Sequence, residues 1–368
     1  MDQERFVLRW VMWQISMFAG GLWALNWRQR LTPGVARLLA ALPLLALNAA
    51  IPAALFPNDL MTNISAFLSC TVTNFKLLSW AMDRGSLVTP PLTALQFLAV
   101  YAWPITPAEN AEAEQGKHTR GRGRLGEART VHTYFRHAVK KAAGVAVVAH
   151  ILARFSLPHV PRVILQGLSQ YLALSLSMDL LAACVGAGTG LAVAPHFDNP
   201  YLSTSLADFW NCRWNLTVSN VLRSCVYDPV MDGRLVRRPG HAAAFSRKRR
   251  VVGLLLVFAV SGLVHEAMFW SFAGRFSPHL KWLTFFVLFG VLLVAEGTLK
   301  KAFKRSKLRV PTVVARILTV AIVNAMLATF WWPPVDQLGI PQAATQNFVD
   351  AWTSVQSAAA AAMRSWHA

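Results

Sequence analysis

Three polar residues, Ser261, His265 and Glu266, interrupt an otherwise apolar stretch that runs from Val251 to Ala273. An ionisable side chain at membrane depth costs roughly 2.5 to 3.5 kcal/mol on insertion scales, so it usually faces a protein interior or a watery cavity. A lone histidine could simply bond a neighbouring helix, but the adjacent glutamate and a serine one turn back favour a functional site. A desolvated imidazole stays neutral near pH 7 and accepts protons, which is the chemistry that activates an alcohol.

Two other chemistries fit these residues less well. His265 and Glu266 begin the zinc-protease pattern HExxH, but Phe269 replaces its second histidine, so a metal ligand is missing. Ser261 lacks the GxSxG turn of a serine nucleophile, and we assign it a supporting role or helix packing. The four cysteines of the chain are isolated from one another. We therefore predict neither a bound metal nor a disulfide framework.

A second group of candidate residues lies in the segment 199–216, where polar and aromatic side chains alternate densely. It contains four candidates for supporting or substrate-binding roles and a terminal asparagine: Asp208, Trp210, Arg213, Trp214 and Asn215. Read alone, the segment could also be an amphipathic helix at the membrane interface, with its tryptophans among the head groups and Asp208 as a cap. Without further context, the interfacial helix is the favoured interpretation of these residues.

Composition predicts the elements that must position these residues. Hydrophobic residues make up 55% of the 368 positions and charged residues only 14%, whereas soluble domains are about a quarter charged. We predict an all-α polytopic membrane protein with a single membrane-embedded domain over residues 1–368. The formal net charge of +19 fits Lys and Arg gathered in cytoplasmic loops, and no nucleic-acid binding is expected.

Eight apolar stretches are long enough to cross a bilayer core of about 30 Å. They are residues 6–26, 35–56, 61–82, 138–157, 163–194, 251–273, 280–298 and 312–332. A ninth segment, residues 92–105, is shorter and is bracketed by prolines, so we predict a re-entrant piece there.

Charge placement orients these spans, because Lys- and Arg-rich loops lie on the cytoplasmic side. Four segments are basic: 28–37, 117–141, 234–250 and 300–316. A common side for all four requires that the ninth segment does not cross, and both termini are then lumenal. Three further regions complete the predicted organisation: a solvated basic loop at 106–137, a cytosolic motif-bearing loop at 195–250 and a C-terminal tail with a short helix at 333–368.

Several sequence blocks carry a resemblance to a known family. They are NFKLL with MDRG (74–78 and 82–85), FDNPYLSTSLADFWNCRWNL (197–216), YDPV (227–230), SGLVHE (261–266) and FFVLFGV (285–291). In this order the blocks resemble the membrane-bound O-acyltransferase superfamily and, within it, the plant wax synthases, which acylate long-chain alcohols. The pairing of DFW-x-x-RWN with a membrane-embedded SGxxHE is the most specific part of the pattern.

The resemblance implies a general base and a second functional residue. His265 would accept the proton of the acceptor hydroxyl as its oxygen attacks the thioester of acyl-CoA, a contribution of about 10² to 10⁴ in rate. Asn215 would orient the imidazole or bond a reacting oxygen through its amide. Acyl-CoA is then a co-substrate, and no cofactor is expected because the thioester is already activated.

The resemblance also implies where the substrates bind. Coenzyme A would approach from the basic cytosolic side of an endoplasmic reticulum membrane, and Arg213 could assist there. Its phosphates have five further candidate partners: Arg223, Arg247, Lys248, Arg249 and Arg250. A long-chain alcohol would enter from the membrane lipids. A sterol or diacylglycerol remains an alternative acceptor, and a transporter or channel with His265 and Glu266 in its ion path is an alternative of a different class.

Overall fold

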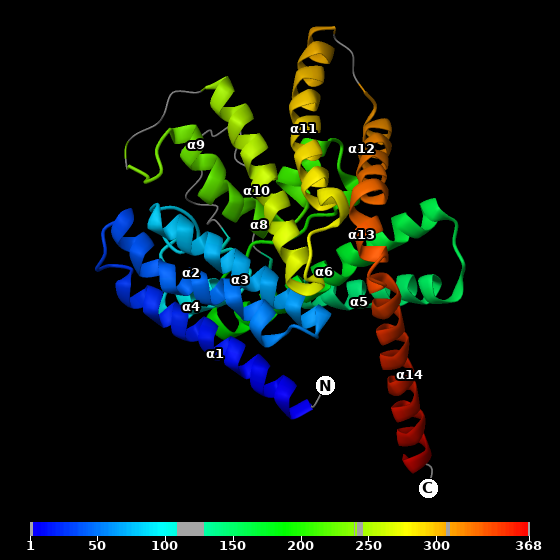
Figure 1. Ribbon diagram of the computed structural model, residues 1–368. Coiled ribbons are helices and arrows are strands. Elements are labelled where there is room, and N and C mark those ends of the chain that lie inside the picture. The colour runs from blue at the N-terminus through cyan, green and yellow to red at the C-terminus, as the bar shows by residue number, and fades with distance from the viewer. Residues whose placement is uncertain (1–2, 109–128, 239, 241–245, 307–309, 367–368) are drawn as a thin grey trace.

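The regular structure is helical throughout residues 3–108, 129–238, 240, 246–306 and 310–366, which the computed structural model describes (Figure 1). The long helices are α1 (Gln3–Trp27), α2 (Val35–Leu55), α3 (Leu60–Ala81), α5 (Val131–Arg154), α6 (His159–Thr189), α10 (Arg247–Ala273), α11 (Lys281–Arg305), α12 (Thr312–Met326) and α14 (Ile340–Trp366). The short ones are α4 (Ala94–Ala102), α7 (Leu206–Asp208), α8 (Leu216–Leu222), α9 (Asp228–Asp232) and α13 (Trp332–Asp336). This architecture confirms the predicted all-α membrane fold.

The candidate membrane spans agree with the prediction in part. Among the described residues, five stretches are long and apolar enough to cross: Val35–Leu55, His159–Thr189, Arg247–Ala273, Pro278–Ala302 and Thr312–Asp336. The three other predicted spans fall on α1, α3 and α5, which are long helices of lower mean hydropathy. The number of eight crossings therefore stays a prediction, while the assignment of the chain as an integral membrane protein is confirmed.

The predicted re-entrant segment contains a short helix. Helix α4 has nine residues, which corresponds to a length of about 14 Å, less than half of the bilayer core. Thr93 and Gln96 form a capping box at its start. Most of its side chains are buried, and its residue Tyr101 packs so closely on Gly20 of α1 that a Cβ there would lie 2.5 Å from the tyrosine hydroxyl.

Two predicted boundaries differ from the structure. The span expected at 163–194 ends as a helix at Thr189, because Gly190 adopts the left-handed conformation (φ 66°) that commonly closes a helix. Its apolar continuation instead pairs with the chain after α4, through the hydrogen bonds Ala194 N–Thr106 O (2.9 Å) and Ala108 N–Ala192 O (2.8 Å). Helix α5 begins at Val131, inside the region expected as a loop. Residues 109–128 of that expected loop lie outside the described residues.

The C-terminal tail holds a longer helix than the short one expected from its alanine run. Helix α14 has 27 residues and extends away from the other helices in Figure 1. The motif-bearing region 195–250 is likewise largely helical rather than an open loop. It contains α7, α8 and α9. Two π-helical turns, Phe209–Arg213 and Arg223–Tyr227, lie between these helices.

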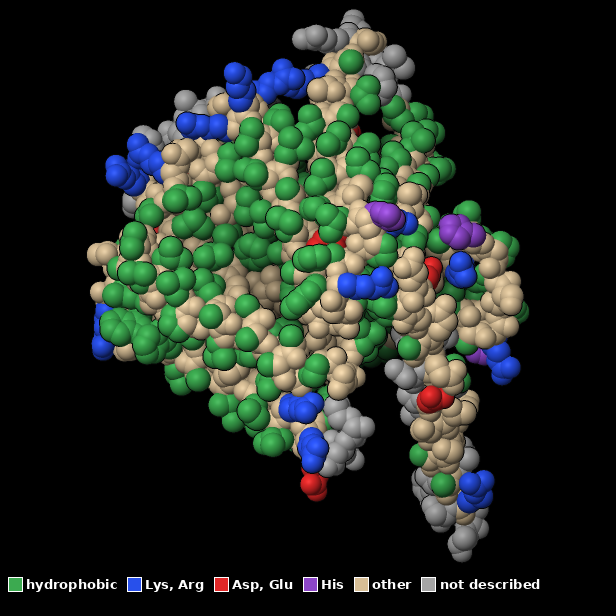
Figure 2. Space-filling view, in the orientation of Figure 1, with side chains coloured by type: hydrophobic (Ala, Val, Ile, Leu, Met, Phe, Trp, Pro, Cys, Tyr) green, Lys and Arg blue, Asp and Glu red, His purple; other side chains and the backbone are tan. Residues whose placement is uncertain are grey.

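The termini of several helices gather at one basic end of the molecule. Arg37 of α2 bonds Asp83 (3.1 Å), Arg84 bonds the carbonyl of Leu235 (3.3 Å), and the amide of Arg237 bonds Met82 O (2.9 Å). In Figure 1 the start of α10, the end of α11 and the start of α12 lie together at the top. Figure 2 shows Lys and Arg side chains along the upper left edge and hydrophobic side chains over most of the face below. This arrangement brings three of the four basic segments, 28–37, 234–250 and 300–316, to one end, whereas residues 117–128 of the fourth segment lie outside the described residues.

Two hydrophobic clusters form the interior. The first cluster joins the four helices α1, α2, α3 and α4 around large side chains such as Trp80 and Phe97. The second joins the motif region to α10, α11 and α13 around Phe258, Phe289 and Trp331. The candidate catalytic residues lie where the second cluster meets α3, and many apolar side chains on the outer helix faces are exposed, as a lipid environment requires.

Candidate active site

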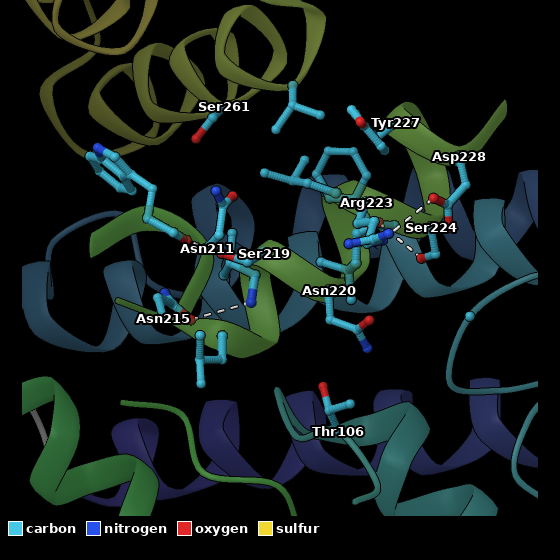
Figure 3. Close-up of a pocket in the computed structure, with 18 of the residues that line it drawn as sticks. Thr106, Asn211, Asn215, Ser219, Asn220, Arg223, Ser224, Tyr227, Asp228 and Ser261 are labelled. Carbon is cyan, nitrogen blue, oxygen red and sulfur yellow. Dashed lines mark hydrogen bonds and ion pairs between the residues drawn. The ribbon is translucent and has the colours of Figure 1, made fainter. Parts of the chain in front are cut away.

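A cavity of about 1320 Å³ lies between α3, the motif region, α10 and α11. It brings together six of the predicted site residues: His265, Asn215, Ser261, Asp208, Trp210 and Trp214. In Figure 3, Asn211, Ser219 and Asn220 form one wall, with Ser261 above them and Thr106 below. Segments that are distant in the sequence therefore share one chamber, which is the first requirement for a common active site.

The hydrogen bond of His265 determines its proton-accepting nitrogen. Its Nδ1 lies 2.7 Å from the carbonyl oxygen of Ser261. A carbonyl can only accept a hydrogen bond, so Nδ1 carries the proton and Nε2 presents a lone pair. Ser261 thus supports His265 through its backbone. This tautomer is the one that a general base working through Nε2 requires.

Aromatic rings hold the imidazole of His265 in place. The ring of Phe286 lies 4.2 Å away between centroids, and those of Trp331 and Trp282 lie at 5.6 and 6.2 Å. Helices α10 and α11 can approach this closely because Gly262 faces Leu283, where a Cβ would lie 2.8 Å from the leucine side chain. Gly262 therefore helps to position His265, because it allows α10 and α11 to pack closely.

Glu266 points away from the cavity and into the joint between α10 and α11. Its carboxylate accepts hydrogen bonds from the amide and hydroxyl of Ser277 (2.9 and 2.6 Å) and from the amide of Leu283 (3.0 Å). It is 2% exposed and does not line the cavity. The acidic group that the sequence placed beside His265 thus anchors the beginning of α11, which carries Phe286.

Replacing Glu266 is expected to weaken the fold more than the chemistry. Glu266→Ala leaves several buried donors unsatisfied, each costing about 1 to 3 kcal/mol, so the melting temperature in detergent should fall clearly. Glu266→Gln retains acceptor capacity and should fall less. Activity per folded molecule, measured below the melting point, should follow the same order. A Glu266→Gln enzyme with native stability and no activity would contradict this structural role.

Asn215 occupies a backbone position that few residue types tolerate. Its φ and ψ angles are 40° and 63°, in the left-handed region, and its side-chain oxygen accepts from the amide of Val218 (3.3 Å), which caps α8. Asparagine is one of the few non-glycine residues that adopt this conformation readily. The oxygen is therefore occupied, and the amide nitrogen Nδ2 is the atom of this side chain that can donate. No hydrogen bond joins the described side chains of Asn215 and His265.

A short antiparallel pairing fixes the backbone around Asn215. The amide of Leu216 donates to His196 O (2.8 Å), and the amide of Asp198 donates to Arg213 O (2.9 Å). Burial lowers the pKa of His196 to about 4, so its ring is neutral at physiological pH. The ring donates through Nε2 to the carbonyl of Pro104 (3.0 Å), which connects the motif region to the chain that follows α4.

The remaining predicted motif residues form the frame of this region. Asp208 accepts from Arg213 Nε and from the amide of Thr204, both at 3.0 Å. Trp210 packs its ring against Phe289 at 5.1 Å, and Trp214 stacks on Phe209 at 5.5 Å. Arg213 is bound to Asp208 and to backbone carbonyls and does not line the cavity. The structure therefore places Arg213 within the motif region and away from the cavity lining.

One end of the cavity is basic. Of the five predicted phosphate partners, Arg223 and Arg250 line it, whereas Arg247, Lys248 and Arg249 do not. The structure adds four basic residues that the sequence did not single out for this role: Arg84, Arg237, Arg238 and Lys300. Arg84 belongs to the MDRG block, which is a sequence signal, but it lies 166 positions from Arg250, so the local sequence does not show that both residues line one cavity.

The lining of the cavity changes from basic to apolar along the axis of α10, from Arg250 toward Met268. At a rise of about 1.5 Å per residue, Arg250 and His265 lie roughly 22 Å apart along the helix axis. Beyond the histidine the lining is mainly apolar, with Met268 of α10 and Phe67 and Leu68 of α3. A molecule with an anionic head and a long apolar chain would match this gradient, with its middle at His265.

These features define an integral membrane protein with a buried polar site between a basic and an apolar compartment. Residues 193–288 match the profile of the membrane bound O-acyl transferase family. The chain is 34% identical over 313 residues to the long-chain-alcohol O-fatty-acyltransferase of Simmondsia chinensis, covering 83% of each chain. It is 32% identical to the probable long-chain-alcohol O-fatty-acyltransferase 3 of Arabidopsis thaliana, covering 82% of each. It is also 29% identical to acyl-CoA–sterol O-acyltransferase 1 of Arabidopsis thaliana, covering 86% of this chain and 87% of that one.

The chain therefore belongs to the membrane-bound O-acyltransferase family, in the branch of the long-chain-alcohol O-fatty-acyltransferases. It is an acyltransferase enzyme. The family membership therefore favours the enzyme interpretation over the transporter or channel. The part of the chain that carries both His265 and Asn215 lies within the matched residues.

Proposed function

We propose that this protein transfers a fatty acyl group from acyl-CoA to the hydroxyl of a long-chain alcohol, forming a wax ester and free coenzyme A. The observation that carries the proposal is the cavity in which His265 presents an unprotonated Nε2 between a basic and an apolar compartment. Relatives named as long-chain-alcohol O-fatty-acyltransferases support the acceptor. The endoplasmic reticulum membrane is the proposed location.

His265 acts as general base in the proposed reaction. Its Nε2 accepts the hydroxyl proton while the alcohol oxygen forms a bond to the thioester carbonyl carbon. The resulting tetrahedral intermediate collapses by breaking the carbon–sulfur bond, and the imidazolium returns the proton to the departing thiolate. No metal, cofactor or acyl-enzyme takes part, because the thioester supplies an activated acyl group.

Asn215 stabilises the charge that develops on the thioester oxygen. Its Oδ1 is held by the amide of Val218, which aims Nδ2 as a fixed donor. A preorganised donor of this kind contributes about 10² to 10³ in rate where it contacts a developing oxyanion. Trp210 and Trp214 exclude water from the same chamber, which favours the alcohol over water as the acceptor.

The basic end receives the phosphates of coenzyme A, and the bilayer supplies the alcohol. Arg223 and Arg250 remain candidate phosphate partners because they line the cavity, together with Arg237, Arg238 and Lys300. Arg84 is a weaker partner because Asp232 already binds it at 2.7 Å. The alcohol enters from the apolar compartment, so the two substrates meet at His265 from opposite ends.

Removing one charge at the basic end should weaken acyl-CoA binding without slowing the chemical step. We expect Arg250→Gln to raise KM for acyl-CoA about 3- to 10-fold, the loss of one phosphate contact, with kcat nearly unchanged. Lys248→Gln is the matched control, because Lys248 lies two residues away, is exposed and does not line the cavity. Equal KM values for the two variants would remove Arg250 from the proposed phosphate site.

A substrate panel tests the acceptor. Membranes from an expression host are given acyl-CoA with fatty alcohols, a sterol or diacylglycerol, and the esters are quantified against membranes that carry His265→Ala. The proposal requires the wax ester to form fastest. Sterol acylation is the second candidate, supported by the similarity to the acyl-CoA–sterol O-acyltransferase, and a dominant steryl ester product would replace the proposal with it.

A further inference from the structure

Lys76 is a lysine buried inside α3 without an acidic partner among the residues that the structure describes. Its side chain is 1% exposed. The ammonium group donates to two backbone carbonyls, those of Val100 at 2.5 Å and Trp103 at 2.6 Å. Lys141 of α5, by contrast, is paired with Asp179 of α6. Lys76 therefore depends on backbone oxygens alone to offset its burial.

The two carbonyls belong to the end of α4. The last carbonyls of a helix have no partner within the helix and carry partial negative charge. A cation there is favourable, and Lys76 reaches it from a different helix. It thereby fixes the point at which α4 ends at Ala102 and the chain turns toward the cavity.

The residues that follow α4 are bonded at three places to the motif region and to the residue just before it. The carbonyl of Pro104 accepts from His196 Nε2 (3.0 Å), and the carbonyl of Thr106 accepts from the amide of Ala194 (2.9 Å). The hydroxyl of Thr106 contacts that of Thr217 at 3.5 Å. Thr106 also lines the cavity, opposite Asn220 in Figure 3.

The same connection continues to Asn215. The carbonyl of His196 accepts from the amide of Leu216 (2.8 Å), the residue next to Asn215. Hydrogen bonds joined by short stretches of backbone thus lead from Lys76 through the end of α4 and His196 to Leu216, the residue after Asn215. Lys76 itself is not among the residues that line the cavity.

Lys76 has both a cost and a benefit for stability. Burying its charge is costly, because no described acidic residue pairs with it. Methionine would fill the same space without a buried charge, but it would leave the carbonyls of Val100 and Trp103 without this donor. The property that methionine lacks is the pair of hydrogen bonds that fixes the end of α4.

We propose that Lys76 is a positioning residue of the active site, which holds Asn215 in its working position through the end of α4 and His196. The inference rests on the proposed function. It assigns Lys76 no contact with substrate, so its removal affects the alignment of Asn215 and leaves acyl-CoA binding unchanged.

The first test compares three variants of the full-length enzyme in detergent. Lys76→Met removes both hydrogen bonds at similar volume and should lower kcat about 10- to 100-fold, with KM for acyl-CoA within twofold of wild type. Lys76→Gln retains an N–H donor and should recover part of kcat. Cys70→Ala is the matched control, because Cys70 is buried on the same helix and contacts Met17. It should lower the melting temperature and leave kcat unchanged.

A double-mutant cycle provides the second test. His196→Phe keeps a planar ring but cannot donate to Pro104, so it breaks the same series of bonds one step further on. If both residues act through this series, the Lys76→Met and His196→Phe double variant should lose little more kcat than the worse single variant. Losses that multiply would overturn the proposal. If Lys76→Met does not fold, the same cycle is measured with Lys76→Gln.

Two results separate the inference from the function on which it rests. Wild-type kcat in folded Lys76→Met would overturn the inference while the enzyme still made ester. Absence of ester synthesis by the wild-type protein with every acceptor would refute the proposed function, and the inference with it.

Discussion

Replacing His265 by asparagine should abolish ester synthesis and leave the fold intact. The Nδ2 of asparagine lies near the position of the imidazole Nδ1 and can still donate to the carbonyl of Ser261, which His265 bonds at 2.7 Å. The variant lacks a basic nitrogen at the position of Nε2. We expect kcat to fall about 10² to 10⁴-fold, the usual contribution of general-base catalysis, with KM for acyl-CoA little changed.

The measurement is wax ester formation by purified enzyme under saturating substrates, with the melting temperature recorded for each variant. His150→Asn is the matched control, because His150 is an exposed histidine of α5 that does not line the cavity. It should retain wild-type kcat. A folded His265→Asn enzyme with wild-type kcat would exclude His265 as the base and would require another proton acceptor in the cavity.

Replacing Asn215 by aspartate should separate its two structural tasks. Aspartate accepts the hydrogen bond from the amide of Val218 as asparagine does (3.3 Å), and it tolerates the left-handed backbone at φ 40°. It loses the Nδ2 donor and places a negative charge where the thioester oxygen becomes anionic. We expect stability close to wild type and a loss of kcat of about 10²-fold or more.

Two further substitutions at this position serve as controls. Asn215→Gly permits the backbone conformation but removes both cap and donor, and Asn215→Ala also introduces strain at positive φ. Melting temperatures should fall in the order aspartate, glycine, alanine, whereas all three variants should lack full activity. High activity in the aspartate variant would show that Asn215 acts as a cap of α8 and not as a donor to the reacting oxygen.

The sequence alone identified the class of this protein and the two residues most central to its proposed chemistry. The long apolar stretches required helices, since backbone polar groups in lipid must be satisfied within their own segment. The cost of an ionisable group among them singled out His265. The resemblance of the motif blocks then added Asn215, and the structure places both in one cavity.

Tertiary structure decided what the individual polar groups do. Glu266 is adjacent to His265 in sequence, yet neighbouring residues on a helix point about 100° apart, so the glutamate anchors α11 instead of sharing the cavity. Arg213 was a candidate for coenzyme A, but the bend of its loop turns it onto Asp208. Local sequence shows that such groups are present, whereas the packing of other elements determines what each one faces.

The basic end of the cavity and the role of Lys76 depend even more on contacts between distant segments. Arg84, Arg250 and Lys300 converge because α3 and α11 end, and α10 begins, at the same side. Lys76 meets the carbonyls of α4 across 24 and 27 positions of sequence. Hydrophobic periodicity specifies which residues are buried in lipid or protein, but it does not show which helix ends lie next to one another. Side-chain packing determines which helix ends meet. It thereby assembles the site around His265, which the sequence shows only as an isolated histidine.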